Sequence, residues 1–350
     1  MRSAIALFGL LSTISSFSQG QSETLHKVEG QVMSARLGPD DWGVQDAGCD
    51  SKGNVFATLR KSEEDEPADR PLLIFDKAGL LKARFSSSSK DDPGVFPVEP
   101  TALLSDGGVA RLTLPRWSCD PPSLSIFSAE GKLKSRVKLD PPAIIPYQLA
   151  VFPSGDSLIS GLERSHSRRS LGAYKSFTGI YDKNGHLQKR LSPPEDAEID
   201  ADAERGDSRY AHGPMFGNMA VSFGQGRLAD DGNVYLMRRT SPATVYVISP
   251  SGDVLRTLSI EPADRGQMPF DMQIGGGRIV VEFSLSCSAD HCEGANFAVA
   301  DALTGQKLSD YADDKSLGGV FGCYSAKPER FTFLTVGDDN KLRMIQASVK

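Results

Sequence analysis

Short apolar runs alternate with polar turns along most of the chain, and the clearest example lies between Gly226 and Ile260. Within it, Val234–Arg238 and Thr244–Ser249 are rich in the β-branched and aromatic residues that favour strands. Val254–Ile260 alternates apolar and polar residues, as expected of a strand with one wet face. Together with the short segment Arg227–Ala229, the pattern predicts four short antiparallel strands joined by tight glycine turns. This is the repeating unit of a propeller.

The same pair of glycine turns recurs along the sequence and separates further units. Glycine is favoured at these turns because such hairpins need a positive φ. The first turn of each unit falls at residues 51–54, 105–108, 153–156, 230–233 and 275–277, and the second at 76–79, 128–131, 182–185, 250–253 and 303–305. Each second turn follows an apolar strand, for example Leu72–Phe75, and precedes an outer strand, for example Leu80–Phe85.

A sixth unit is incomplete, because three strands are predicted at Gly318–Ser325, Phe331–Val336 and Lys341–Ser348 and the chain then ends. The segment Lys27–Leu37 alternates like a strand and has no partner of its own. Pairing it with the last unit removes an exposed sheet edge. We therefore predict an all-β fold: a six-bladed β-propeller with four antiparallel strands per blade, whose last blade is closed by an N-terminal strand. Residues 27–350 form its single domain, with a long insertion at about 192–225.

The turn and strand sequences carry a family resemblance. Asp231-Gly232-Asn233-Val234-Tyr235, Tyr246-Val247-Ile248 and Gly252-Asp253-Val254-Leu255 together resemble the repeats of NHL-like and YncE-like six-bladed β-propellers. The resemblance covers residues 27–350 and implies the architecture. Propellers of this kind serve as binding platforms and as scaffolds for several chemistries, so function has to be argued from a site.

Residues 1–20 have the composition of a secretory signal peptide. Met1-Arg2 supplies a positive charge, Ala4–Leu11 forms an apolar run, and Ser16–Gly20 contains the small residues of a cleavage site. The alternative is a buried N-terminal helix, but the segment has no amphipathic period. The sequence contains no apolar run of membrane-spanning length. These features predict a secreted or periplasmic protein.

The sequence has five cysteines, which can pair in an oxidising compartment. Cys287 and Cys292 bracket a short polar loop, which predicts a local disulfide; a zinc site with His291 is the alternative. Cys49 and Cys323 follow glycines at equivalent places in the first and last units, which allows a ring-closing disulfide; the alternative is that the inner strands of adjacent blades lie too far apart for one.

The connections between the second and third strands of the predicted units, together with the insertion, are long and share one face of the ring. Long loops on a rigid scaffold commonly carry a binding site. Arginines at strand ends can hold an anion, Trp117 can stack on a ligand, and the segment 210–216 can act as a lid. The predicted ligand-binding residues are Arg60, Arg116, Trp117, Arg164, Tyr210, His212, Arg238 and Arg239. The alternative is that they are ordinary surface residues. Alternating acids at 196–204 indicate either calcium binding or a solvated acidic loop.

The sequence does not favour one reaction. It has five histidines and lacks a P-loop, a nucleophile elbow and an HExxH motif, and its predicted inner strands contain few acids. We therefore predict no metal and no cofactor. A net charge of −6 argues against a nucleic-acid partner.

The working hypothesis is a monomeric, non-catalytic binding module for a protein, peptide or glycan on the long-loop face. The first alternative is a hydrolase or lyase that acts on a small anionic substrate with His212 as base. The second is a structural subunit of an envelope assembly.

Overall fold

The computed structural model describes residues 22–35, 37, 41–50, 52–61, 71–85, 95–115, 121–163, 175–192, 226–264, 267–284, 295–313 and 317–349. Every regular element in these ranges is a β-strand. In the described part of the protein, no helix is long and apolar enough to cross a membrane. The predicted signal peptide, most of the insertion, and Cys287 and Cys292 lie outside the described residues.

Four sheets contain four antiparallel strands each, in sequence order. The first sheet is β2 (Asp41–Cys49), β3 (Val55–Lys61), β4 (Leu72–Phe75) and β5 (Leu81–Phe85). The second is β6 (Val95–Leu103), β7 (Val109–Pro115), β8 (Ser123–Phe127) and β9 (Leu133–Lys138). The third is β10 (Ile144–Val151), β11 (Ser157–Glu163), β12 (Lys175–Tyr181) and β13 (Leu187–Leu191). The fourth is β14 (Gly226–Leu228), β15 (Val234–Arg238), β16 (Ala243–Ile248) and β17 (Val254–Ile260).

The fifth sheet has eight strands in the order β18-β19-β20-β21-β1-β24-β23-β22. One half is β18 (Met268–Gly275), β19 (Arg278–Ser284), β20 (Ala295–Asp301) and β21 (Lys307–Asp313). The other half is β1 (Glu23–Val32) with β22 (Val320–Ala326), β23 (Glu329–Val336) and β24 (Leu342–Ser348). The two halves are joined by a short parallel pairing of β1 with β21 at residues 23–25.

The predicted N-terminal closing strand is confirmed. β1 pairs antiparallel with β24, from His26 opposite Ser348 to Val32 opposite Arg343. Its bounds differ from the prediction, since β1 begins at Glu23 and ends at Val32. Beyond it, the backbone N–H of Ser34 donates to the Gly79 carbonyl at 2.9 Å, so the backbone passes directly onto the first sheet.

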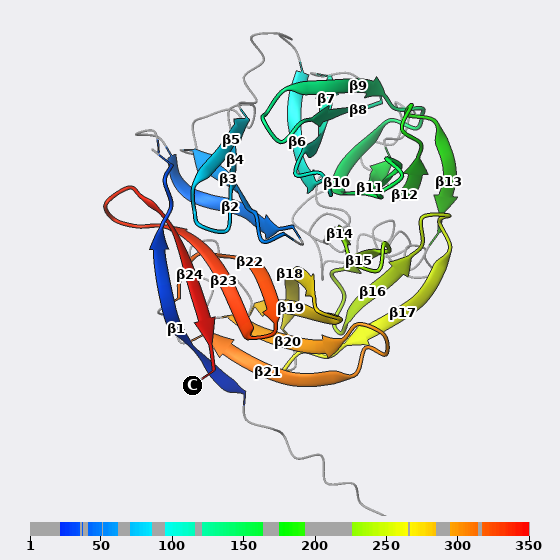
Figure 1. Cartoon of the computed structure of the whole chain (residues 1–350). Coiled ribbons are helices and arrows are strands. Elements are labelled where there is room, and N and C mark those ends of the chain that lie inside the picture. The colour runs from blue at the N-terminus through cyan, green and yellow to red at the C-terminus, as the bar shows by residue number, and fades with distance from the viewer. Residues whose placement is uncertain are drawn as a thin grey trace, which may run out of the picture.

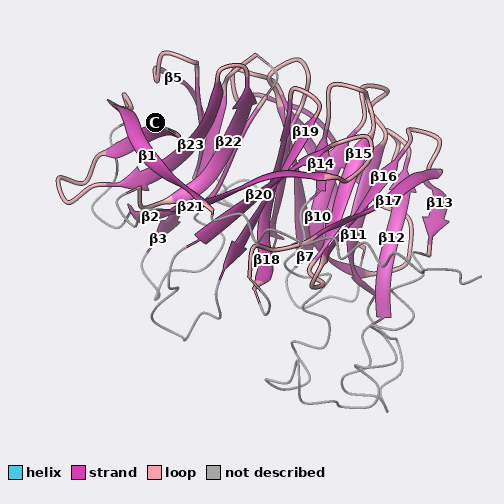
Figure 2. Cartoon of the chain, turned by 90° about the horizontal axis from the view of Figure 1, so that it is seen from below, coloured by secondary structure: helices cyan, strands magenta, loops and turns pink. Residues whose placement is uncertain are grey.

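The sheets stand around a common centre, as in a β-propeller (Figure 1). The first strand of each repeat lies near the centre and the last strand lies outside. Contacts between neighbouring inner strands run β6–β10–β14–β18–β22–β2. Figure 2 shows the strands running from one face of the ring to the other.

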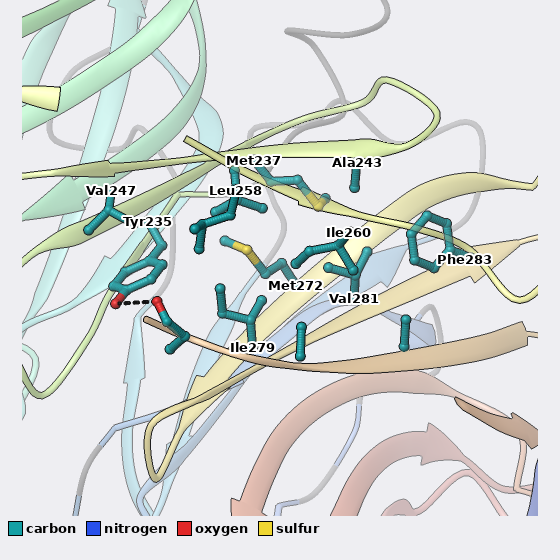
Figure 3. Packing of buried hydrophobic residues seen from close by; sticks show 14 residues of the cluster. Tyr235, Met237, Ala243, Val247, Leu258, Ile260, Met272, Ile279, Val281 and Phe283 are labelled. Atoms are coloured by element: carbon teal, nitrogen blue, oxygen red, sulfur yellow. Dashed lines mark hydrogen bonds between the residues drawn. The ribbon is translucent and has the colours of Figure 1, made fainter. Parts of the chain in front are cut away.

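The core lies between consecutive sheets rather than inside one of them. Met237 and Val247 of the fourth sheet pack with Met272, Ile279 and Phe283 of the fifth (Figure 3). Second and third strands are buried on both faces, whereas an outer strand such as β17 alternates exposed and buried residues. The solvent-exposed outer strand is the one whose sequence alternates between apolar and polar residues, as expected when only one face of a strand is buried.

The two halves of the eight-stranded sheet also pack on each other. Phe297 of β20 lies 5.1 Å from Phe321 of β22 and 5.6 Å from Phe333 of β23, measured between ring centroids. Val280 and Leu25 join the same cluster. The sheet is therefore folded over a core of its own, because residues on its two halves face each other.

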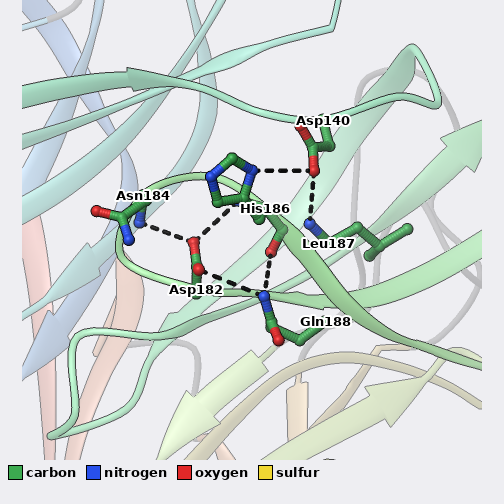
Figure 4. Close-up of polar contacts among 6 residues, drawn as sticks. All are labelled: Asp140, Asp182, Asn184, His186, Leu187 and Gln188. Atoms are coloured by element: carbon green, nitrogen blue, oxygen red, sulfur yellow. Dashed lines mark hydrogen bonds and ion pairs between the residues drawn. The ribbon is translucent and has the colours of Figure 1, made fainter.

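The repeated turns owe their shape to an aspartate and a glycine three residues later. Asp182 Oδ1 accepts hydrogen bonds from the backbone N–H groups of Asn184 (2.8 Å) and His186 (2.9 Å), and Gly185 between them has a φ of 87° (Figure 4). Asp76 makes the equivalent bonds to Ala78 and Leu80. Backbone hydrogen bonding lowers the pKa of Asp182. The side chain thus satisfies turn donors that the sheet leaves unpaired.

A disulfide joins Cys49 of β2 to Cys323 of β22, with 5.5 Å between the two Cα atoms. It connects the first sheet to the last half-sheet across 274 residues of sequence, so the ring-closing pair that the sequence left open is formed. The inner strands of these neighbours approach closely because residues such as Ala47, Leu334 and Met344 pack between them.

Candidate functional site

A cavity of about 880 Å³ lies at the centre of the ring. Its wall includes a residue from each first strand: Gly48, Thr101, Ala150, Arg227, Gln273 and Tyr324. It extends to the tight turns that follow these strands, including Gly53, Ser105, Pro153, Gly232, Gly276 and Lys327.

The wall has a particular chemistry because every first strand is an end strand of its sheet. An end strand has backbone N–H and C=O groups that no sheet neighbour uses. One of these groups already has a side-chain partner, since Arg227 Nε donates to the Met272 carbonyl at 3.2 Å. A ligand in the cavity can therefore hydrogen-bond to the walls without any sheet opening.

One charged cluster crosses the centre of the ring, and we call Asp46, Arg227 and Asp271 the Arg227 cluster. Arg227 Nη2 lies 3.3 Å from Asp271 Oδ1 and 3.8 Å from Asp46 Oδ1. The three residues come from β2, β14 and β18, in three different sheets. Asp271 is buried, and its other oxygen lies 3.5 Å from Gln273 Nε2. The guanidinium therefore links first strands of three different sheets.

Burial raises the pKa values of two acids, Asp271 in the Arg227 cluster and Glu282 beside it. It raises the pKa of Asp271 to about 7, against the lowering effect of Arg227, while Asp46 raises it further. Burial also raises the pKa of Glu282, which pairs with Asp271 across β18 and β19, to about 8, and the charges of Asp271 and Asp313 add to this. Near neutral pH, Glu282 is therefore mostly protonated and Asp271 is about half protonated, so both raised pKa values reduce the negative charge near Arg227.

Substituting Glu282→Gln should stabilise the protein at alkaline pH. The pKa of Glu282 is 4.5 in an ordinary environment and about 8 in the fold, so the folded state holds the proton more tightly. The wild-type free energy of unfolding therefore falls as pH rises between these values. We expect Glu282→Gln to be more stable than the wild type by up to about 4 kcal/mol at pH 8.5 and nearly equal to it at pH 4.5. Urea unfolding at both pH values measures this, with the exposed position Glu261→Gln as matched control. A stability difference that does not change with pH would contradict it.

The structure describes the side chains of two of the predicted ligand-binding residues, Arg238 and Arg239. Arg238 ends β15 and is fully buried. Its guanidinium donates to Ser160 Oγ at 3.0 Å and to Thr178 Oγ1 at 2.8 Å, so it ties the fourth sheet to the third. Arg239 follows it and is partly buried. Arg60 belongs to β3, and its side chain lies outside the described residues, as do Arg116, Trp117, Arg164, Tyr210 and His212.

The central cavity lies at the start of β15, whereas Arg238 lies at the end of this strand. Gly232, which lines the cavity, precedes β15.

Sequence reasoning missed the Arg227 cluster. The available signal was the presence of Asp46, Arg227 and Asp271 in first strands that are otherwise mostly apolar or small. Among the described residues, no group of three or more His, Cys, Asp or Glu side chains is placed to hold a metal ion.

Comparison with known proteins shows the fold and no family. No protein-family model matches the sequence, and no curated protein matches it. A protein of unknown function from Dyadobacter fermentans is similar over 93% of this protein and 99% of its own length, at 12% identity and a TM-score of 0.51. The GH74 xyloglucanase from Xanthomonas campestris matches 92% of this protein over 45% of its own length, at 13% identity and a TM-score of 0.50.

The β-propeller domain of the Trilobed protease from Pyrococcus furiosus matches 87% of this protein and 80% of its own length, at 11% identity and a TM-score of 0.41. The identities of these solved structures are too low to transfer a function, so the likeness concerns architecture alone. The narrower NHL-like or YncE-like resemblance stays a prediction.

Proposed function

We propose that this protein is a non-catalytic binding module that takes part of a protein, peptide or glycan into the central cavity of a six-bladed β-propeller. The observation that carries the proposal is the cavity itself, walled by end strands of all the sheets. Its volume of about 880 Å³ falls in the range of ligand-binding pockets.

The count of six blades is supported by the packing between sheets. The buried residues form six hydrophobic clusters, and each joins strands of consecutive repeats. The two halves of the eight-stranded sheet pack face to face through Phe297, Phe321 and Phe333, as two separate blades would. The β1–β21 pairing that joins them extends over three residues at the ring's outside.

The wall chemistry fits a polar framework such as a sugar or a peptide backbone. Free N–H and C=O groups of the first strands, with Thr101 and Gln273, offer donors and acceptors on fixed elements. A wall that is already ordered limits the entropy lost on binding. The predicted loop residues, Arg60 and Trp117 among them, would then contact a larger partner on the other face.

The disulfide supports a secreted or periplasmic location. Disulfides form and persist in oxidising compartments, and the Cys49–Cys323 pair joins inner strands of the ring. This agrees with the signal peptide predicted at residues 1–20.

Blocking the cavity should abolish ligand binding. Ser325 is an exposed residue of β22 that lines the cavity, so Ser325→Trp should occupy it without disturbing the core. The matched control is Ser259→Trp at an exposed position of the outer strand β17. A panel of peptides and oligosaccharides is screened by thermal shift and confirmed by calorimetry. Ligands that raise the Tm of the wild type and of Ser259→Trp should have no effect on Ser325→Trp.

Equal binding by Ser325→Trp, or no binding by any panel member, would contradict the proposal. Chemical turnover of a bound ligand would favour the hydrolase or lyase alternative.

A further inference from the structure

We propose that the cavity contains an anion-binding site in which Arg227 receives a carboxylate of the ligand and Asp271 is the internal counterion that this carboxylate replaces. The inference rests on the proposed function and specifies the ligand chemistry. The ligand class is a carboxylate, whether of a free acid, a peptide C-terminus or a uronic acid.

Arg227 is placed to meet a ligand. It lines the cavity, and its side chain remains 16% exposed. Its contacts with the described residues use Nε, on the Met272 carbonyl, and Nη2, on Asp271 and Asp46. Among those residues none accepts a hydrogen bond from Nη1, so two of the five guanidinium N–H groups are open to a carboxylate. Gln273 lines the cavity beside it and can position the ligand.

The ion pair between Arg227 and Asp271 is long for a buried pair, although Asp271 Oδ1 also accepts a hydrogen bond from the Met272 N–H at 2.6 Å. The distance from Nη2 to Asp271 is 3.3 Å, and the distance to Asp46 is 3.8 Å, beyond hydrogen-bonding range. Tight charge-assisted bonds are about 2.7–2.9 Å. A ligand carboxylate that binds Arg227 at such a distance would therefore compete successfully, provided that Asp271 can lose its charge.

The surroundings of Asp271 allow that change. The described charged groups near it are Arg227 on β14, Asp46 on β2 and Glu282 on β19, with Asp313 of β21 behind Glu282. On β22 the described titratable group is Tyr324, whose hydroxyl donates to Glu329 at 2.6 Å. Two further carboxyl groups, Asp46 and Glu282, thus lie beside the pair that Asp271 forms with one guanidinium. With a pKa of about 7, Asp271 can take up a proton when a ligand supplies the negative charge.

Binding should therefore be linked to proton uptake. The competent form has Asp271 protonated, and its population falls about tenfold from pH 6 to pH 8 for a pKa of about 7. The apparent affinity for a carboxylate should fall by about the same factor over this range.

The test is titration calorimetry with succinate at pH 6 and pH 8, with its uncharged analogue succinamide as ligand control. Wild-type protein should bind succinate about tenfold more tightly at pH 6 and take up a proton on binding at pH 8. Asp271→Asn, which mimics the protonated acid, should bind tightly at both pH values without proton uptake. Arg227→Gln should bind at neither. The matched surface controls, Asp253→Asn and Arg190→Gln, should behave like the wild type.

Retention of succinate binding in Arg227→Gln, an unchanged pH dependence in Asp271→Asn, or tighter wild-type binding at pH 8 would overturn the inference. So would the absence of succinate binding by the wild type. If neutral peptides or oligosaccharides still bind in a manner abolished by Ser325→Trp, the proposed function stands and only the carboxylate site fails. Peptides with free or amidated C-termini, and neutral or uronate-containing oligosaccharides, identify the source of the carboxylate.

Discussion

Removing the Cys49–Cys323 disulfide should lower the free energy of unfolding by about 5 kcal/mol. The bond closes a loop of 274 residues, and the chain-entropy estimate grows with the logarithm of loop length. The double variant Cys49→Ala/Cys323→Ala keeps apolar side chains in the cluster where Cys323 packs, so the crosslink is the main feature lost. Guanidinium unfolding of the variant and the wild type measures the difference.

Treatment of the double variant with reductant is the control, because it measures any contribution from the remaining cysteines. The variant should still form the β1–β24 pairing, since those hydrogen bonds do not depend on the disulfide. A loss below about 1 kcal/mol would show that sheet pairing and the packing of Ala47 against Leu334 and Met344 close the ring without help.

Substituting Arg238→Ala should destabilise the protein by about 4 kcal/mol. The side chain is fully buried and donates two hydrogen bonds across the boundary between the third and fourth sheets. Truncation leaves a cavity and removes both donors, and each effect costs one to several kcal/mol. Urea unfolding measures the loss.

A second variant separates volume from hydrogen bonding. Arg238→Met fills much of the space, and Ser160 Oγ and Thr178 Oγ1 already lie 2.9 Å apart and can bond to each other. Its expected loss is about 2 kcal/mol, well below that of Arg238→Ala. The exposed Arg190, paired with Glu163 at 2.6 Å, is the control, and Arg190→Ala should cost less than about 1 kcal/mol. Equal losses for Arg238→Ala and Arg190→Ala would contradict the structural role of Arg238.

Strand positions could be predicted well because they depend on local pattern. Val254–Ile260 and Leu72–Phe75 are strands with the predicted bounds. Each predicted turn contains a glycine, Gly185 among them, with the positive φ that the turn requires. The closing strand was predictable from an unpaired alternating segment, but its start at Glu23 was not, because residues 23–25 pair in parallel with β21 rather than extending the alternation.

The candidate site could be predicted only in part. Arg238 stands at a strand end, like other predicted arginines, and nothing in the neighbouring sequence shows that its side chain is buried. Arg238 is buried because Ser160 and Thr178 of the preceding sheet present hydroxyl groups to it. That contact spans at least 60 residues of sequence and depends on how two sheets pack.

The sequence by itself determined the repeat, the glycine turns and the pairing of the two chain ends, because alternation, turn chemistry and unpaired edges act over a few residues. Only the tertiary structure decided the Arg227 cluster. Asp46, Arg227 and Asp271 lie far apart in sequence, and their charges interact because closure of the ring brings three first strands to one level of the centre. Burial there, which depends on every sheet at once, then brings the pKa of Asp271 to about 7.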